Sequence, residues 1–167
     1  QAAVRPGITT LELDTLAEAH IRDHGGIPNF QLVPGYRHTL CTSVNEEIVH
    51  GIPGPTVLDE GDIISIDCGA VIDGWHGDAA FTAGVGEVSD EAARLIEVTR
   101  RSMMAGIAAM VPGGRMGDVG AAVQTVVEAA GFSVVREYVG HGIGRAMHEK
   151  PEVPNYGRQG KGSKLTR

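Results

Sequence analysis

The stretch IISIDCGAVIDGWHGDAAF, residues 63–81, predicts a β-hairpin. Asp73-Gly74 is a two-residue turn of the kind that hairpins favour, and the residues on both sides are rich in Ile, Val and aromatic side chains. Pairing Ile72 with Trp75 across this turn sets the register of the two strands. The hairpin therefore fixes which side chains share a face.

The predicted register brings two carboxylates together. Asp78 falls opposite Gly69 and Asp67 opposite Ala80, so both aspartates point to the same face, about 7 to 8 Å apart at Cα. Two carboxylates this close repel each other unless a cation lies between them, so a divalent metal is the natural partner. The apolar residues around both aspartates indicate burial, and buried charge needs a partner. The alternative is a solvated acidic face, because exposed Asp is ordinary.

Three histidines stand in glycine-containing segments. His141 lies in VGHGIGRAMHE, residues 139–149, and a neutral imidazole is a good ligand for a transition metal beside carboxylates. His148, seven residues on, could donate a hydrogen bond to a carbonyl or to the oxyanion formed from it. His50 lies in VNEEIVHGIPG, residues 44–54. Each histidine taken alone is more often structural, and His76, two residues from Asp78, could support the site.

Composition excludes several classes of protein. Fourteen Lys and Arg against 21 Asp and Glu give a net charge of −7, which disfavours binding to DNA or to anionic membranes. No apolar run approaches the roughly 20 residues that span a bilayer, so a soluble cytoplasmic protein is expected. The two cysteines, Cys41 and Cys68, fit a reducing compartment. The sequence has no GxSxG, P-loop, HExxH or CxxC motif, which leaves hydrolysis by a metal-activated water as the leading chemistry.

Hydrophobic periodicity predicts three helices and four strands. The first helix, 9–24, has a capping box of Thr9 and Glu12 and an apolar face that includes Leu16. The second spans 89–111 and the third 118–130. Strands are expected at 39–44, 62–69, 75–83 and 134–139. The inward residues expected of the second helix are Leu95, Ile96, Thr99, Met103, Ile107 and Met110.

The first and third helices match each other at an offset of 106 residues, which indicates an internal duplication. Pro6-Gly7 falls on Pro112-Gly113, and Gly25 falls on Gly131. Repeat one would span about 6–84, a linker helix 89–111, and the start of repeat two about 112–156. A chance match is the alternative, because Pro-Gly commonly precedes a helix.

Three motifs occur in the order and spacing of the type I methionine aminopeptidases, which are pita-bread metallopeptidases. They are NEEIVHGIP at 45–53, IDCGAVIDGWHGD at 66–78 and GHGIGRAMHEKP at 140–151. The resemblance implies an α/β pita-bread fold with a pseudo-twofold repeat, formed by residues 1–167 as a single catalytic domain whose second half is incomplete. The chain opens at Gln1 without methionine and stops in a loop-like tail, so it resembles a family member truncated at both ends.

The resemblance also implies roles for individual residues. Asp67 would chelate one metal, Asp78 would bridge two, and His141 would bind the other. His50 and His148 would be catalytic, contacting the substrate and stabilising the tetrahedral intermediate. The pocket for the methionine side chain resembles Tyr36, Cys41 and Met147, whose polarisable groups suit a thioether.

The implied activity is removal of the initiator methionine from nascent proteins, by attack of metal-bound hydroxide on the first peptide bond. The cofactors would be two divalent ions (Co, Fe, Mn or Zn) in the full-length parent. Two glutamates that complete the family's site are missing before Arg167, and Glu149 and Glu152 stand in other contexts. Partial or no metal occupancy and little activity are therefore expected of this chain alone.

The expected partners are N-terminal Met-peptides, with no DNA and no membrane, and the chain is expected to be a monomer. The basic tail could contact the ribosome, although a solvated loop is the simpler explanation. Two alternatives stay open: a pita-bread binding module without catalysis, and a relative of the proline-specific peptidases. The joint presence of Asp67, Asp78 and His141 argues against the first, and the HGIP sequence at 50–53 argues against the second.

Overall fold

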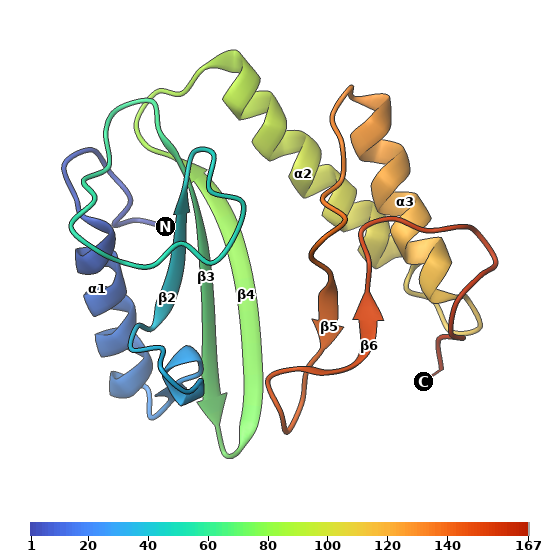
Figure 1. Ribbon diagram of the computed structural model, residues 1–167, viewed down its shortest axis with the longest axis horizontal. Helices are drawn as coiled ribbons and strands as arrows, with labels where there is room; N and C mark the ends of the chain where they lie inside the picture. Colours follow the sequence, from blue (N-terminus) through green and yellow to red (C-terminus); the bar gives the residue numbers. More distant parts are fainter. Residues whose placement is uncertain (167) are drawn as a thin grey trace. The chain divides into compact units, whose positions relative to one another are not determined.

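The computed structural model describes residues 1–166 and forms two compact units. The first unit contains Gln1–Ala93 and the short segment Ile143–Met147. The second contains Arg94–Gly142 and the residues from His148 onward. Segment Ile143–Met147 is therefore continuous in sequence with the second unit but packs in the first. Figure 1 shows the elements of both units in chain order.

The first unit is built on an antiparallel sheet in which β3 (Ile63–Ile72) is the central strand. It pairs with β4 (Trp75–Gly84) along one edge and with β2 (Leu40–Val44) along the other (Figure 1). The short β1 (Ile27–Pro28) pairs with β3 on the same edge as β2. The turn residues Asp73 and Gly74 both have positive φ, 53° and 75°, as a primed hairpin turn requires. The predicted hairpin is confirmed.

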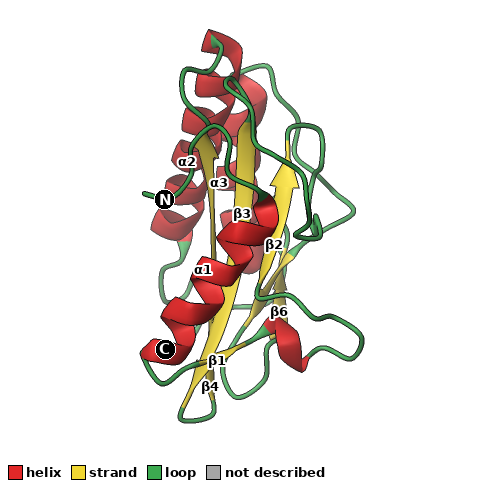
Figure 2. Ribbon diagram, turned by 90° about the vertical axis from the view of Figure 1, so that its left-hand side faces the viewer, coloured by secondary structure: helices red, strands yellow, loops and turns green. Residues whose placement is uncertain are grey.

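One face of this sheet carries the hydrophobic core. Helix α1 (Thr10–Asp23) lies across the strands (Figure 2), and its capping box of Thr9 and Glu12 forms as predicted. Leu13 and Ile21 are buried on the helix, whereas Leu16 is 53% exposed, so its predicted inward position is wrong. The apolar stripe of α1 is narrower than the periodicity suggested, because only part of it faces the strands. The buried core cluster is Ile8, Leu13, Leu40, Leu58, Ile64, Ile66 and Val85.

A buried carboxylate joins α1 to the start of β2. Asp14 is 5% exposed, and its Oδ1 accepts hydrogen bonds of 2.8 Å from the backbone N–H groups of Thr39 and Leu40. Its Oδ2 lies 3.3 Å from Nδ1 of His38. Because Thr39 and Leu40 are themselves buried, water cannot replace these bonds. Asp14 thus holds the segment that leads into β2.

The Asp14→Ala variant should lose about 2 to 4 kcal/mol of unfolding free energy, because two buried N–H groups lose their acceptor. Urea denaturation followed by circular dichroism measures the loss. Asp23→Ala, an exposed aspartate on the same helix, is the control and should change stability by less than about 0.5 kcal/mol. Equal losses in the two variants would contradict the role given to Asp14.

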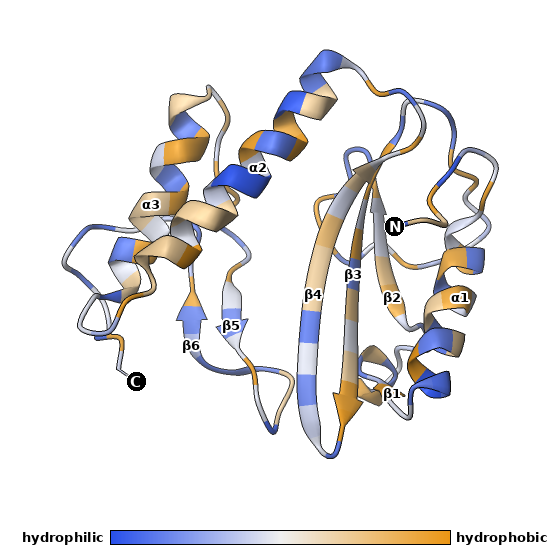
Figure 3. Ribbon diagram, turned by 180° about the vertical axis from the view of Figure 1, so that it is seen from behind, coloured by the Kyte–Doolittle hydropathy of each residue, from blue (hydrophilic) through white to orange (hydrophobic). Residues whose placement is uncertain are grey.

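In the second unit, α2 (Asp90–Ala109) packs against α3 (Met116–Ala129) through a stripe of mostly small residues. The first turn of α2 belongs to the first unit. The buried positions of α2 are Val98, Ser102 and Gly106. A Cβ added at Gly106 would lie 2.8 Å from Cγ2 of Val123 on α3, so this glycine permits the close approach. Figure 3 shows hydrophilic and hydrophobic residues alternating along α2.

The face of α2 predicted to point inward is therefore wrong. Five of the six residues predicted to point inward are exposed: Leu95, Thr99, Met103, Ile107 and Met110, which directly follows the helix. Hydrophobic spacing alone favoured the large side chains, but close helix packing selects the face with the small ones, because only there can the two backbones approach. The helix bounds agree with the prediction to within two residues, as α3 begins at Met116 rather than 118.

The strand predicted at 134–139 is also wrong. Those residues form no strand, and β5 (Gly140–Gly142) begins directly after them and pairs with β6 (Glu149–Val153). β-Branched and aromatic residues favour a strand only where a partner strand lies beside them, and the ladder starts at Gly140 with Val153. His141 consequently lies within a strand rather than just past one.

Helices α1 and α3 support the predicted duplication. Each has 14 residues, and both the starts, Thr10 and Met116, and the ends, Asp23 and Ala129, are separated by the offset of 106. The glycines that precede and follow each helix at this offset, Gly7 with Gly113 and Gly25 with Gly131, all have positive φ. The exact boundaries of the two repeats stay a prediction.

Candidate metal and substrate site

Asp67 and Asp78 lie on the face of the sheet opposite the core. The register pairs Gly69 with Asp78 and Asp67 with Ala80, as predicted from the turn. Because side chains alternate along a strand, Ile66, which directly precedes Asp67, points into the core while both carboxylates point away from it. The hairpin turn therefore decides that the two acids share a face.

The carboxylate of Asp78 contains a buried oxygen that no protein donor satisfies. Its Oδ1 is shielded from solvent and has no hydrogen-bond partner among the described residues. A buried carboxylate oxygen in this state is costly unless a cation or another donor occupies the adjoining space. The donor set, two carboxylates on one face, suits a hard or borderline divalent cation.

Next to Asp78 lies Asn29, a polar residue that the sequence analysis missed. Asn29 is 0% exposed, and its Oδ1 lies 2.6 Å from Nδ1 of His76. The backbone N–H of Asn29 donates to the carbonyl of Gly69, the strand partner of Asp78. No sequence signal pointed to Asn29, because it lies in a loop 40 or more residues away from both of these contacts. His76, considered only as a possible support, is shown to have a buried partner.

Tyr36 and Cys41 adjoin the carboxylate face. Cys41 pairs with Asp67 in the ladder, so their side chains share a face, and Oη of Tyr36 lies 3.5 Å from Sγ of Cys41. The Tyr36 hydroxyl donates to the carbonyl of Leu40 at 2.6 Å. Burial, together with the nearby charge of Asp67, raises the pKa of the Cys41 thiol, so it stays neutral at neutral pH. These two predicted pocket residues lie together beside Asp67.

His50 has an unusual backbone conformation. Its φ is 61°, a left-handed value that costs a residue with a Cβ roughly 1 kcal/mol. The next residue, Gly51, has its backbone so close to Thr42 that a Cβ would lie 2.1 Å from the Thr42 carbonyl oxygen. The contact with β2 thus holds the chain in the strained conformation at His50.

Segment Ile143–Met147 is attached to the β3–β4 hairpin. The carbonyl of Gly144 accepts a 2.8 Å hydrogen bond from the backbone N–H of His76. Arg145 donates to the carbonyl of Asp73 at 3.1 Å, and its Cζ lies 4.1 Å from the centre of the Trp75 ring. Met147, predicted to line the pocket, belongs to this segment and therefore to the first unit.

His141 and His148 flank that segment and belong to the second unit, where their ring centroids are 4.3 Å apart. Nδ1 of His141 lies 2.9 Å from the carbonyl oxygen of Gly142, which fixes the tautomer with Nδ1–H and leaves Nε2 as the acceptor. This is the orientation typical of a metal-binding histidine, whose other nitrogen donates to a carbonyl. Within residues 1–166, no three His, Cys, Asp or Glu side chains are grouped so that they could hold one ion.

Comparisons with known proteins identify the family. The profile of Metallopeptidase family M24 matches residues 1–166. The chain is 53% identical to the methionine aminopeptidase of Clostridium acetobutylicum, over 99% of this chain and 66% of that protein. It is 52% identical to methionine aminopeptidase 1 of Bacillus subtilis, over 97% of this chain and 65% of that protein. The chain belongs to metallopeptidase family M24.

Solved structures agree with this assignment. The crystal structure of methionine aminopeptidase from Rickettsia prowazekii superimposes with a TM-score of 0.96 at 43% identity, over 98% of this chain and 66% of that one. The prolidase of Pyrococcus furiosus gives a TM-score of 0.80 at 19% identity, over 95% of this chain and 46% of that one, which shows a shared fold alone. The M24 chain thus has the α/β pita-bread fold that its motifs predicted, and it spans about two thirds of the length of these methionine aminopeptidases.

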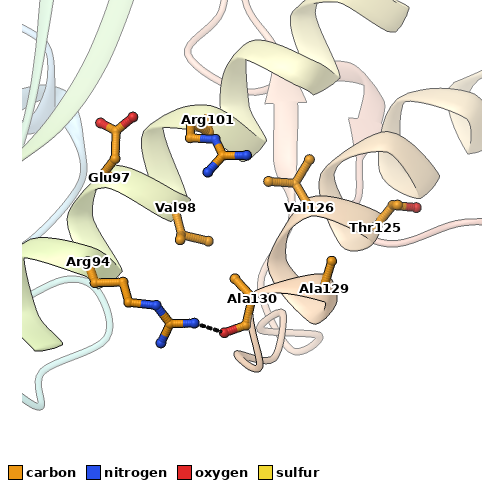
Figure 4. A pocket seen from close by; sticks show the side chains of 8 residues that line it. All are labelled: Arg94, Glu97, Val98, Arg101, Thr125, Val126, Ala129 and Ala130. Carbon is orange, nitrogen blue, oxygen red and sulfur yellow. Dashed lines mark hydrogen bonds between the residues drawn. The ribbon is translucent and has the colours of Figure 1, made fainter.

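A separate cavity of about 470 Å³ lies between α2 and α3 of the M24 chain (Figure 4). Val98 and Val126 form an apolar part of its wall, and Arg94 at its edge donates to the carbonyl of Ala130 (Figure 4). None of the predicted site residues lines it.

No helix within residues 1–166 is both long enough and apolar enough to cross a membrane.

At position 50 of the M24 chain, the His50→Gly variant should be more stable than His50→Ala by about 1 kcal/mol. Both variants lose the imidazole and its contacts, but only glycine adopts a φ of 61° without steric cost. Thermal or urea denaturation measures the difference. An alanine variant as stable as the glycine variant would show that the backbone at this position is unstrained.

Arg145→Ala should loosen the attached segment. Loss of one hydrogen bond and one cation–π contact should speed hydrogen exchange at the His76 amide, which donates to Gly144, by about 5- to 10-fold. Arg136→Ala is the matched control, because Arg136 makes the same kind of contact, 4.6 Å from the Tyr156 ring, in the second unit. Unchanged exchange at His76 in the Arg145 variant would refute the attachment.

Proposed function

We propose that the protein to which this chain belongs is a methionine aminopeptidase, which removes the initiator methionine from nascent proteins in the cytoplasm. The observation that carries the proposal is the buried, unpartnered Oδ1 of Asp78 on the same face as Asp67. The 53% identity to a methionine aminopeptidase supports the substrate class. The prolidase resemblance is limited to the fold, so it does not favour a proline-specific activity.

Asp67, Asp78 and His141 are the proposed metal ligands. The two aspartates come from adjacent strands of one sheet, and His141 presents Nε2 because its Nδ1–H is held by a carbonyl. A bound divalent cation (Co, Fe, Mn or Zn) would polarise the scissile carbonyl and activate a water as the nucleophile at neutral pH.

The other proposed roles belong to the chain's own side chains. His50 and His148 donate hydrogen bonds to the substrate carbonyl as negative charge develops on its oxygen. The strained backbone at His50 is the kind of conformation that is retained where the side chain must point in one direction. A fixed donor of this kind loses no free energy to reorganisation during the reaction.

Tyr36, Cys41 and Met147 form the proposed pocket for the methionine side chain. The neutral thiol of Cys41 and the thioether of Met147 are polarisable groups that pack well against another thioether. Since Cys41 lies directly opposite Asp67 in the ladder, a side chain bound there would hold the adjoining peptide bond close to the carboxylates. The proposed substrate is thus an extended N-terminal Met-peptide.

Metal titration by calorimetry tests the ligand set. The chain carries three of the five ligands that the family resemblance implies, so Co²⁺ or Mn²⁺ should bind weakly to the wild-type chain. Asp78→Ala should reduce the affinity for the metal at least 10-fold, because it removes one of the two proposed carboxylate ligands on the β3–β4 face. Asp23→Ala, an exposed carboxylate on α1, is the control and should bind as the wild type does.

Identical titrations for wild type and Asp78→Ala would sink the proposed site. The substrate assignment is tested separately, by release of methionine from a Met-Ala-Ser peptide with the full-length protein. Release should need added divalent metal and should fail for the full-length Asp78→Ala variant. Release of an N-terminal residue other than methionine at a comparable rate would overturn the assigned specificity.

A further inference from the structure

Asn29 occupies space that a side chain at position 69 would fill. A Cβ added at Gly69 would lie 2.7 Å from Nδ2 of Asn29 and 2.8 Å from its Cβ. Gly69 is the direct cross-strand partner of Asp78, and the Cβ positions of such a pair lie about 4.5 to 5.5 Å apart on one face. The amide of Asn29 therefore stands on the carboxylate face, in the place opposite the Asp78 side chain.

Both members of this facing pair contain a buried atom without a partner. Nδ2 of Asn29 is a donor and Oδ1 of Asp78 is an acceptor, and neither is hydrogen-bonded to a protein atom among the described residues. Leaving either atom buried and unsatisfied costs about 1 to 3 kcal/mol. Nδ2 of Asn29, which lies over Gly69, and Oδ1 of its cross-strand partner Asp78 are therefore an unsatisfied donor and an unsatisfied acceptor that face each other. This arrangement points to a single polar group between them.

The contact with His76 fixes which end of the amide faces Asp78. Oδ1 of Asn29 lies 2.6 Å from the imidazole Nδ1, so the amide nitrogen is the atom left to face the carboxylate. The reversed amide would direct its oxygen toward the carboxylate, and the two acceptors would repel. His76 thus holds Asn29 in the orientation that presents a donor.

We propose that Asn29 is a positioning residue for Asp78, acting through one ordered water that accepts from Nδ2 of Asn29 and donates to the Asp78 carboxylate. One water can join two polar atoms that lie about 5 to 6 Å apart, and a buried polar space with a donor and an acceptor is where such waters occur. The bridge fixes the carboxylate rotamer. Its value for metal binding rests on the proposed function, whereas the bridge itself does not.

Nitrogen-15 NMR of the side-chain amides tests the bridge in the metal-free chain. The Asn29 side-chain NH₂ signal should shift in Asp78→Asn, which alters the acceptor while preserving the shape of the side chain. Asn45 is the matched control, because its Nδ2 donates directly to Oδ1 of Asp62, and its NH₂ signal should stay in place. An Asn29 signal unmoved by the change at Asp78 overturns the proposal.

Two variants of similar size separate positioning from packing. Asn29→Ser and Asn29→Ala both remove the bulk of the amide. Only the serine variant keeps a hydrogen-bond donor, its hydroxyl group. Metal affinity by calorimetry should fall about 10-fold or more in the alanine variant and recover at least in part in the serine variant. Equal losses in the two variants reduce Asn29 to a packing residue and overturn the proposal.

The outcomes also separate the two proposals. If the wild-type chain binds no metal but the Asn29 signal responds to Asp78→Asn, the proposed metal site fails and the water bridge stands. If metal binds and the signal does not respond, the bridge fails while the metal site stands. Circular dichroism of each variant confirms that the chain remains folded, so that a loss of affinity reports the site.

Discussion

The alternation of side chains across the β3–β4 hairpin is the constraint on which the candidate site depends. The primed turn at Asp73-Gly74 fixes the register, and the register puts Asp67 and Asp78 on one face and the apolar core on the other. A slip of one residue between β3 and β4 would turn over the side chains of β4, so that Asp78 would point to the face opposite Asp67. Hydrophobic burial on one face therefore fixes the position of the acids on the other, with no contact between the acids being needed.

The carboxylate face of this hairpin contains buried polar atoms that have no hydrogen-bond partner among the described residues. Oδ1 of Asn29 contacts Nδ1 of His76, whereas Nδ2 of Asn29 and Oδ1 of Asp78 are buried without a partner among the described residues. By contrast, the buried carboxylate of Asp14 is paired with the N–H groups at the start of β2. The difference between the two aspartates is the one expected between a structural carboxylate and the proposed metal ligand.

Sequence and fold together establish the family of this chain. The M24 profile and the superposition at a TM-score of 0.96 cover nearly the whole chain. The roles of His50, His141 and His148 rest on motif resemblance together with local geometry, namely a strained φ and a fixed imidazole tautomer. The pair of Tyr36 and Cys41 lies beside Asp67, as the proposed pocket at the proposed metal site requires.

The sequence by itself determined the hairpin register, the capping box of α1, the bounds of the helices to within two residues and the motifs of the family, because these depend on neighbours in the chain. It did not determine the buried face of α2, where close packing of small residues against α3 overrode the spacing of large ones. Nor did it determine the absence of a strand at 134–139, which needs a partner strand, or the place of Asn29. Tertiary structure decided these because each depends on a surface that a distant segment supplies.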